Sequence, residues 1–137
     1  MFFRAPGVFL VLLLVTALWG CTRADDTANM TELQRLKSGS LDVVLLSHNE
    51  VLRKGKDTFT IEFRSDGTLV NVGNVRVSAN MSMPGMAMFG NIEVQPTNVP
   101  GRYTANSDFG MAGTWRMTVD WDGSAGRGSI SFAGSVQ

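Results

Sequence analysis

The chain has 137 residues, 44 % of them hydrophobic, which is enough for one domain with a packed core and too few for two. Twelve Lys and Arg residues are balanced by twelve Asp and Glu residues. A neutral chain offers no basic field to a phosphate-rich partner, so the charge argues against nucleic-acid binding. The composition also includes eight Met and a single Cys, and one Cys cannot form an internal disulfide.

Residues 1–20 are predicted to be a signal peptide. Arg4 supplies a positive charge, and the apolar run over residues 8–18 is too short to span a bilayer comfortably. The sequence LWGC at residues 18–21 then resembles the lipobox of bacterial lipoproteins, in which the chain is cut before a Cys that carries a diacylglyceryl group. The alternative is an ordinary signal peptide followed by a free or buried Cys, or an uncleaved signal anchor.

Lipidation of Cys21 would give the protein a membrane anchor made of acyl chains rather than a membrane span. It would also remove the only thiol, and with it Cys nucleophiles and thiolate metal sites. We therefore expect a protein anchored on the periplasmic side of a bacterial membrane. Thr22 stands where an inner-membrane retention Asp would sit in enterobacterial lipoproteins, and that resemblance favours the outer membrane in an organism that has one.

The next segment, residues 21–38, is predicted to be a flexible tether. Residues 22–29 are small and polar and show no apolar periodicity. Residues 30–37 have a weak helical bias, with Leu33 and Leu36 on one side, but two turns are too short to be stable alone.

From residue 39 onward the apolar residues alternate with polar ones, which is typical of β-strands. Turn signals such as Ser65-Asp66-Gly67 and Pro100-Gly101 separate the alternating runs. This pattern predicts an all-β domain over residues 39–137, an immunoglobulin-like antiparallel β-sandwich of about seven strands. The expected strands are residues 41–46, 58–64, 74–81, 92–94, 102–105, 115–121 and 128–132.

The core of this sandwich cannot rest on the Cys–Trp–Cys set of antibody domains, because only one Cys is present. Tyr103 follows a Pro-Gly turn, where such sandwiches often place a corner tyrosine, and we expect its hydroxyl to bond a nearby backbone group. The aromatic side chains expected in the core are Phe59, Phe63, Trp115 and Trp121.

The densest feature of the sequence is MSMPGMAM at residues 81–88, with four Met in eight positions. The central Pro84-Gly85 suits a type II turn, since Pro presets φ and Gly accepts a positive φ. Type II turns splay tight hairpins, so these two residues could instead cap a wider loop. In a tight hairpin all four thioethers would share one face, in the pairs Met83–Met86 and Met81–Met88.

Thioethers are soft, neutral ligands that suit Cu(I) and Ag(I) rather than Zn, Mg or Ca. An exported protein that handles Cu(I) has reason to use Met, because Met does not form disulfides and binds at acidic pH. A second loop carries another Met, and the only His follows the first expected strand. The predicted metal ligands are Met83, Met86, Met88 and Met111, with Met81 and His48 as possible helpers.

Two other interpretations of the methionines remain open. Met81 continues the inward face of Val75 and Ala79, so it could simply be core, and Met117 is expected to be core between two Trp residues. A Met-rich loop can also be an adaptable apolar contact surface for a partner protein. For His48 alone a structural or solvated role is favoured.

Several segments together resemble the YtkA-like, or FixH-like, domain over about residues 40–122. They are LRKGKDTFT at 52–60, Asp66-Gly67, the methionine segment at 81–88, GRYTA at 101–105 and FGMAGTW at 109–115. The resemblance implies an immunoglobulin-like sandwich outside the cytoplasm, found alone, as lipoproteins, or beside heavy-metal efflux or cytochrome-oxidase assembly components. It implies no catalytic activity. The shared positions are Met83, Pro84, Gly85, Met86, Met88, Met111, Gly113 and Trp115.

Two functions therefore compete. The first is a lipoprotein that binds Cu(I) or Ag(I) for buffering or relay. The second is a non-metal accessory module that docks on a membrane efflux or oxidase-assembly complex. An enzyme is not expected, because the chain has no nucleophile elbow, no zinc-protease motif and no phosphate loop, and its acidic residues fall at turns and outward positions.

Overall fold

The structure is a computed structural model, and it describes residues 27–137. The predicted signal peptide, Cys21 and the first part of the predicted tether lie outside the described residues. The described part of the chain contains nine β-strands and no helix, and so none that could cross a membrane. The strands are β1 (Thr31–Ser38), β2 (Leu41–Ser47), β3 (Gly55–Ser65), β4 (Thr68–Leu69), β5 (Asn74–Met83), β6 (Met86–Pro96), β7 (Arg102–Phe109), β8 (Gly113–Gly123) and β9 (Gly126–Val136).

The prediction of an all-β fold is confirmed, and each of the seven expected strands is present. Two strands were not predicted, β1 and β4. The weak helical bias assigned to residues 30–37 is wrong, since β1 pairs antiparallel with β2 along its length. Leu33 and Leu36 are three residues apart, a spacing that suggested a helix, because a strand normally puts such residues on opposite faces. A register shift between Glu32 and Gln34 lets both side chains pack against the core from a strand.

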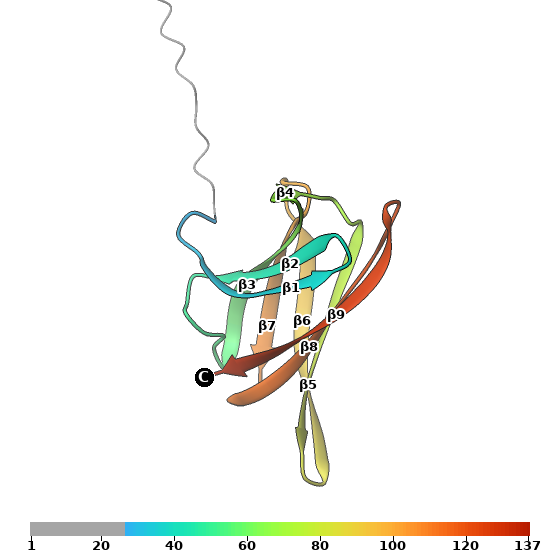
Figure 1. Cartoon of the computed structure of the whole chain (residues 1–137). Helices are drawn as coiled ribbons and strands as arrows, with labels where there is room; N and C mark the ends of the chain where they lie inside the picture. The colour runs from blue at the N-terminus through green and yellow to red at the C-terminus, as the bar shows by residue number, and fades with distance from the viewer. Residues whose placement is uncertain (1–26) are drawn as a thin grey trace, which may run out of the picture.

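The strands form one path in the order β1-β2-β3-β7-β6-β5-β8-β9, with β4 on β3 (Figure 1). β6 joins two layers, because residues 86–90 pair with β5 and residues 91–96 pair with β7. Gly90 marks the crossing, where a Cβ would lie 3.2 Å from the ring of Phe109. The result is sandwich-like and nearly closed, with β1, β2, β3 and β7 facing β5, β8 and β9.

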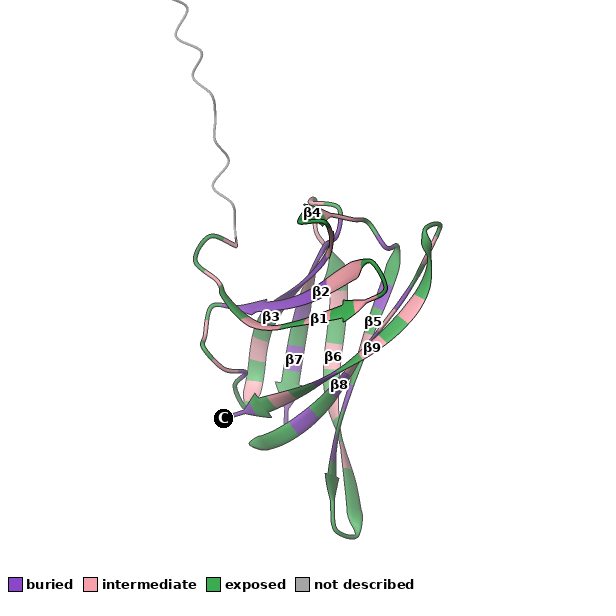
Figure 2. Cartoon of the chain, viewed as in Figure 1, coloured by how far each residue is buried: buried purple, intermediate pink, exposed green. Residues whose placement is uncertain are grey.

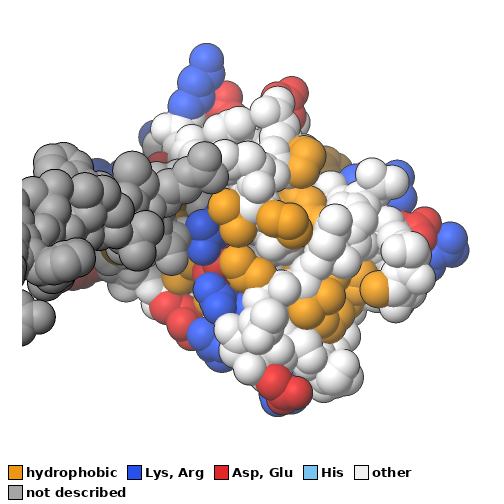
Figure 3. Space-filling model, turned by 90° about the horizontal axis from the view of Figure 1, so that it is seen from above, with side chains coloured by type: hydrophobic (Ala, Val, Ile, Leu, Met, Phe, Trp, Pro, Cys, Tyr) orange, Lys and Arg blue, Asp and Glu red, His pale blue; other side chains and the backbone are white. Residues whose placement is uncertain are grey.

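The core lies between these two layers. The four aromatic residues expected there are all buried, and so is Met117. Phe63 makes edge-on contacts with Trp121 and Tyr103, at centroid separations of 5.3 and 5.6 Å. Seen from above, apolar side chains gather between acidic and basic ones at one end of the molecule (Figure 3).

The second face of β2 and β3 is buried as well (Figure 2). Val44 is 1 % exposed, and on β3 Thr60 and Glu62 are 5 % and 3 % exposed. Residues 43–47 of β2 are buried on both faces. The expectation that acidic residues fall at turns and outward positions is wrong for Glu62, which is buried in the middle of β3.

The Tyr103 hydroxyl hydrogen-bonds a backbone group, as expected of a corner tyrosine. The group is not close to Tyr103 in the sequence but belongs to a different loop. The hydroxyl donates to the Gly73 carbonyl oxygen at 2.7 Å, in the loop between β4 and β5. Burial raises the pKa of this hydroxyl above its usual 10.0, and hydrogen bonds to the backbone of Val72 and Gly73 only partly offset the effect.

Tyr103→Phe should remove the part of the stability loss at alkaline pH that comes from ionisation of the Tyr103 hydroxyl. The raised pKa means that the folded state holds the phenol proton more tightly, so stability is full below pH 10.0 and falls as pH rises through the folded-state value. The Phe variant should be less stable near neutral pH by about 1–3 kcal/mol, because the Gly73 carbonyl loses its donor. It should also lose less stability between pH 9 and 11 (about the titration range).

Urea unfolding of both proteins across this pH range is the measurement. Tyr103 is the only tyrosine in the chain, so its near-ultraviolet absorbance reports ionisation at this site alone. Parallel pH profiles for the two proteins would contradict the prediction.

Candidate metal-binding hairpin

β5 and β6 form a tight hairpin whose two-residue turn is Pro84-Gly85. Gly85 has a φ of 76° and Pro84 has no positive φ, which is the pattern of a type II turn. Met83 lies opposite Met86, and two positions back Met81 lies opposite Met88. The wider loop considered from the sequence is not formed. In Figure 1 this hairpin projects beyond the other strands.

The four thioethers lie on one face of the hairpin but at different depths. They continue the inward side of β5, since residues two apart on a strand share a face. Met81 is 8 % exposed and Met88 is half-buried against the core. Met83 and Met86, beside the turn, are 39 % and 63 % exposed. The face therefore runs from the core out to solvent at the tip (Figure 2).

The loop between β7 and β8 lies against the base of this face. A Cβ on Gly113 would lie 2.6 Å from Met81 Cε and 3.5 Å from its Sδ. A Cβ on Gly110 would meet Met88 Cε at 3.9 Å. The missing side chain at Gly113 is what lets Met81 approach so closely. The loop that carries Met111 thus lies next to two methionines of the hairpin.

Met111 is held in place through its backbone. Its carbonyl oxygen accepts a hydrogen bond from Trp115 Nε1 at 3.0 Å, and its side chain packs partly against the core. Trp115 is fully buried and contacts the ring of Phe109 at 5.1 Å between centroids. A displacement of the Met111 backbone would therefore disturb the hydrogen bond of the buried Trp115 indole.

The hairpin itself is uncharged, since residues 79–90 contain no Asp, Glu, Lys, Arg or His. His48 lies in the exposed loop after β2 and makes no hydrogen bond or ion pair within the part of the chain described. The structure thus brings the five predicted methionines to one region and records no contact between them and His48. Among residues 27–137, no three His, Cys, Asp or Glu side chains are grouped so that they could hold a metal ion.

One exposed aromatic side chain was not singled out from the sequence. Phe89 lies on the outward face of the hairpin opposite Asn80, and it is 79 % exposed. Its position in the sequence could have identified it, because in a strand whose Met88 faces inward the next residue must face outward. Together with Met86 it makes the hairpin the most exposed apolar part of the domain.

The sequence model of the YtkA-like family matches residues 35–120 of the chain. No curated protein sequence matches it. Among solved structures, a DUF4426 family protein from Pseudomonas aeruginosa is similar, with a TM-score of 0.51 and 15 % sequence identity. The match covers 74 % of this chain and 94 % of that one. At this identity the likeness concerns the fold alone.

Proposed function

The chain belongs to the YtkA-like family, and on that premise we propose that it is an exported lipoprotein that binds Cu(I) or Ag(I) through the β5–β6 hairpin. The observation that carries the proposal is the register, which sets four thioethers on one uncharged face. Thioethers are ligands for these two ions and poor ligands for hard cations.

The different depths of the methionines suit uptake and release of an ion. Met83 and Met86 are exposed enough to take an ion from solvent or from another protein. Met88 and Met111, nearer the core, would complete its coordination, with Met81 as a further donor. Because thioethers carry no titrating proton, binding should persist at acidic pH. Lipidation at Cys21 would keep the site at the periplasmic side of a membrane, in the outer membrane where the organism has one.

Such a protein needs no catalytic residues, and we propose that it is not an enzyme. Its part would be to buffer the ion or to pass it to a partner, for which a metal-efflux or oxidase-assembly protein is the class that the family resemblance suggests. The exposed tip supports transfer of the ion, since an acceptor protein can contact Met83 and Met86 before the deeper methionines release the ion.

A second function is favoured by Phe89. An aromatic side chain that is 79 % exposed beside Met86 is a typical anchor for a protein contact. In this alternative the hairpin docks on a membrane efflux or oxidase-assembly complex without any metal. The two functions differ in whether the methionines bind an ion.

A Cu(I) titration against a competing chromophoric chelator, without oxygen, tests the proposal. The wild-type domain should take a single tight equivalent from the chelator and hold it at low pH. A variant with Met83, Met86 and Met88 changed to Leu should lose it, since Leu keeps the apolar volume and removes the sulfur. Met30→Leu, outside the hairpin, is the matched control and should bind as the wild type does.

Failure of the wild-type domain to compete at all would overturn the metal proposal and leave docking as the function. Retention of the equivalent by the triple variant would show that the ion is held elsewhere. Circular dichroism and urea unfolding of each variant would establish that the fold is unchanged.

A further inference from the structure

The two layers of the domain meet along two seams. At the seam between β1 and β9 the two strands form no ladder, but Leu52, in the loop between β2 and β3, bridges to Val136, and Gln34 Nε2 donates to the Ala133 carbonyl at 3.2 Å. The other seam lies between β5 and β6. These strands pair only where residues 79–83 face residues 86–90. Past Gly90, β6 turns to β7 while β5 stays on β8, and no described strand lies between them.

A cleft of about 880 Å³ opens at this unpaired part of the seam. Val75, Trp121, Tyr103 and Val94 give it apolar walls, and all but Val94 are more than nine-tenths buried. Its charged lining residues are two acidic and two basic ones, among them Asp122 and Arg127, which form an ion pair at 3.1 Å, and Asn74 and Ser129 add neutral polar groups. A ligand of this cleft therefore needs no net charge.

The hairpin register shows which backbone groups face the unpaired part of the seam. In a two-residue hairpin the residues flanking the turn, Met83 and Met86, exchange hydrogen bonds, and every second residue then points the same way. On β5 this alternation directs the N–H and C=O of Val75 and Val77 toward β6. On β6 it directs those of Ile92 and Val94 toward β5. Neither set has a strand partner among residues 27–137.

We propose that this cleft binds an extended segment of a partner protein, which adds as a strand to the open edge of β5 or β6. Unpaired N–H and C=O groups in strand geometry recognise another strand above all. The free run of β5, residues 74–78, fits a strand of about five residues. Every second side chain of the guest would meet the apolar wall of the cleft, which includes Val75 and Val94.

The geometry favours a single strand over a second copy of this chain. The two free edges belong to facing layers, so they border a recessed cleft rather than an outward rim. A folded domain could not bring its own edge between them, whereas an extended segment can. Pro96, which has no N–H, ends the free edge of β6 and limits how far a guest strand can pair.

The test is selection from a random-peptide phage library on the immobilised full chain in detergent. The selected peptides should alternate apolar and polar residues. Methylating their backbone nitrogens one at a time should weaken binding at every second position and leave the positions between unaffected, because only alternate amides face the edge. Uniform tolerance of methylation, or no enriched peptide, would overturn the proposal.

Two variants locate the site. Val75→Pro removes an N–H that faces the cleft without touching the β8 ladder, and it should weaken peptide binding about tenfold, the equivalent of one or two hydrogen bonds. Val75→Ala keeps the N–H and is the control. Val94→Pro makes the same change on β6, should Val75→Pro fail to fold. Equal peptide affinity for the Pro variants and the wild type would contradict the proposal, as would self-association of the wild type that Val75→Pro abolishes.

Discussion

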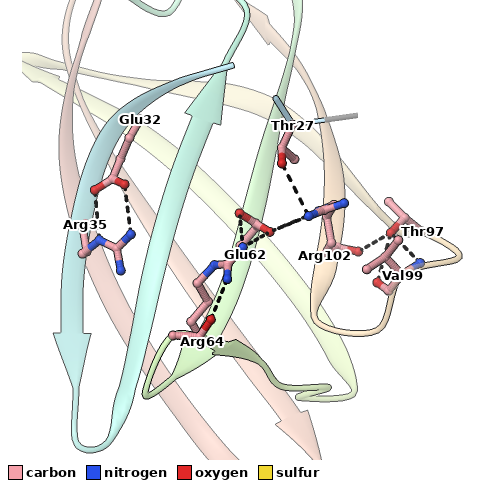
Figure 4. Close-up of polar contacts among 9 residues, drawn as sticks. Thr27, Glu32, Arg35, Glu62, Arg64, Thr97, Val99 and Arg102 are labelled. Carbon is pink, nitrogen blue, oxygen red and sulfur yellow. Dashed lines mark hydrogen bonds and ion pairs between the residues drawn. The ribbon is translucent and has the colours of Figure 1, made fainter. Parts of the chain in front are cut away.

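Glu62→Gln is expected to lower the free energy of unfolding by about 3–5 kcal/mol, the usual effect of removing one partner from a buried ion pair. Both Arg102 Nε and Nη2 donate to Glu62 Oε2, at 3.1 and 3.0 Å, and Arg64 Nη2 reaches both carboxylate oxygens (Figure 4). The Glu62 side chain is 3 % exposed and that of Arg102 is 10 % exposed. A neutral amide would remove the negative charge that both guanidinium groups share at Glu62.

Urea unfolding at neutral pH measures the effect. The matched control is Asp122→Asn, which breaks the ion pair with Arg127, where the side chains are 53 % and 81 % exposed. Exposed pairs contribute little, so this variant should change stability by no more than about 0.5 kcal/mol. Similar losses for both variants would show that burial is not what makes Glu62 important.

Gly123→Ala is expected to destabilise the domain by about 1–3 kcal/mol through overpacking. A Cβ at this position would clash with the Val72 carbonyl oxygen and lie 3.0 Å from Gly73 Cα. These are backbone atoms, so no flexible side chain can move aside. The loop between β4 and β5 crosses the end of β8 here, and the same loop accepts the Tyr103 hydrogen bond.

Gly110→Ala is the control for this substitution, because the only atom near its Cβ would be Met88 Cε at 3.9 Å. Thermal and urea unfolding of the two variants should differ by the cost of the contact with the loop. Equal stability of Gly123→Ala and Gly110→Ala would contradict the prediction, because it would mean that the loop between β4 and β5 can move away from β8 at little cost. The Tyr103 absorbance in Gly123→Ala would then show whether the loop had moved.

Much of the candidate site could be predicted from the sequence, because its geometry is local. Pro84-Gly85 and the flanking methionines lie within eight residues, so turn chemistry and strand alternation were enough to pair Met83 with Met86 once a tight hairpin was assumed. The choice between a tight hairpin and a wider loop was not local. It depended on the β8 and β7 partners that extend β5 and β6 away from the turn. His48 was proposed as a helper ligand from its residue type alone, and residue type does not predict where a loop lies relative to the hairpin.

The sequence by itself determined the all-β class, seven of the nine strands, the aromatic core and the family, because alternation and short motifs record which side of a strand faces inward. Only the tertiary structure decided that residues 31–38 form a strand, that Glu62 is buried and that β6 divides between two layers. Glu62 meets Arg102 across 40 residues, and β1 is a strand because β2 is beside it. Such partners are set by the packing of the whole domain, which local patterns do not contain.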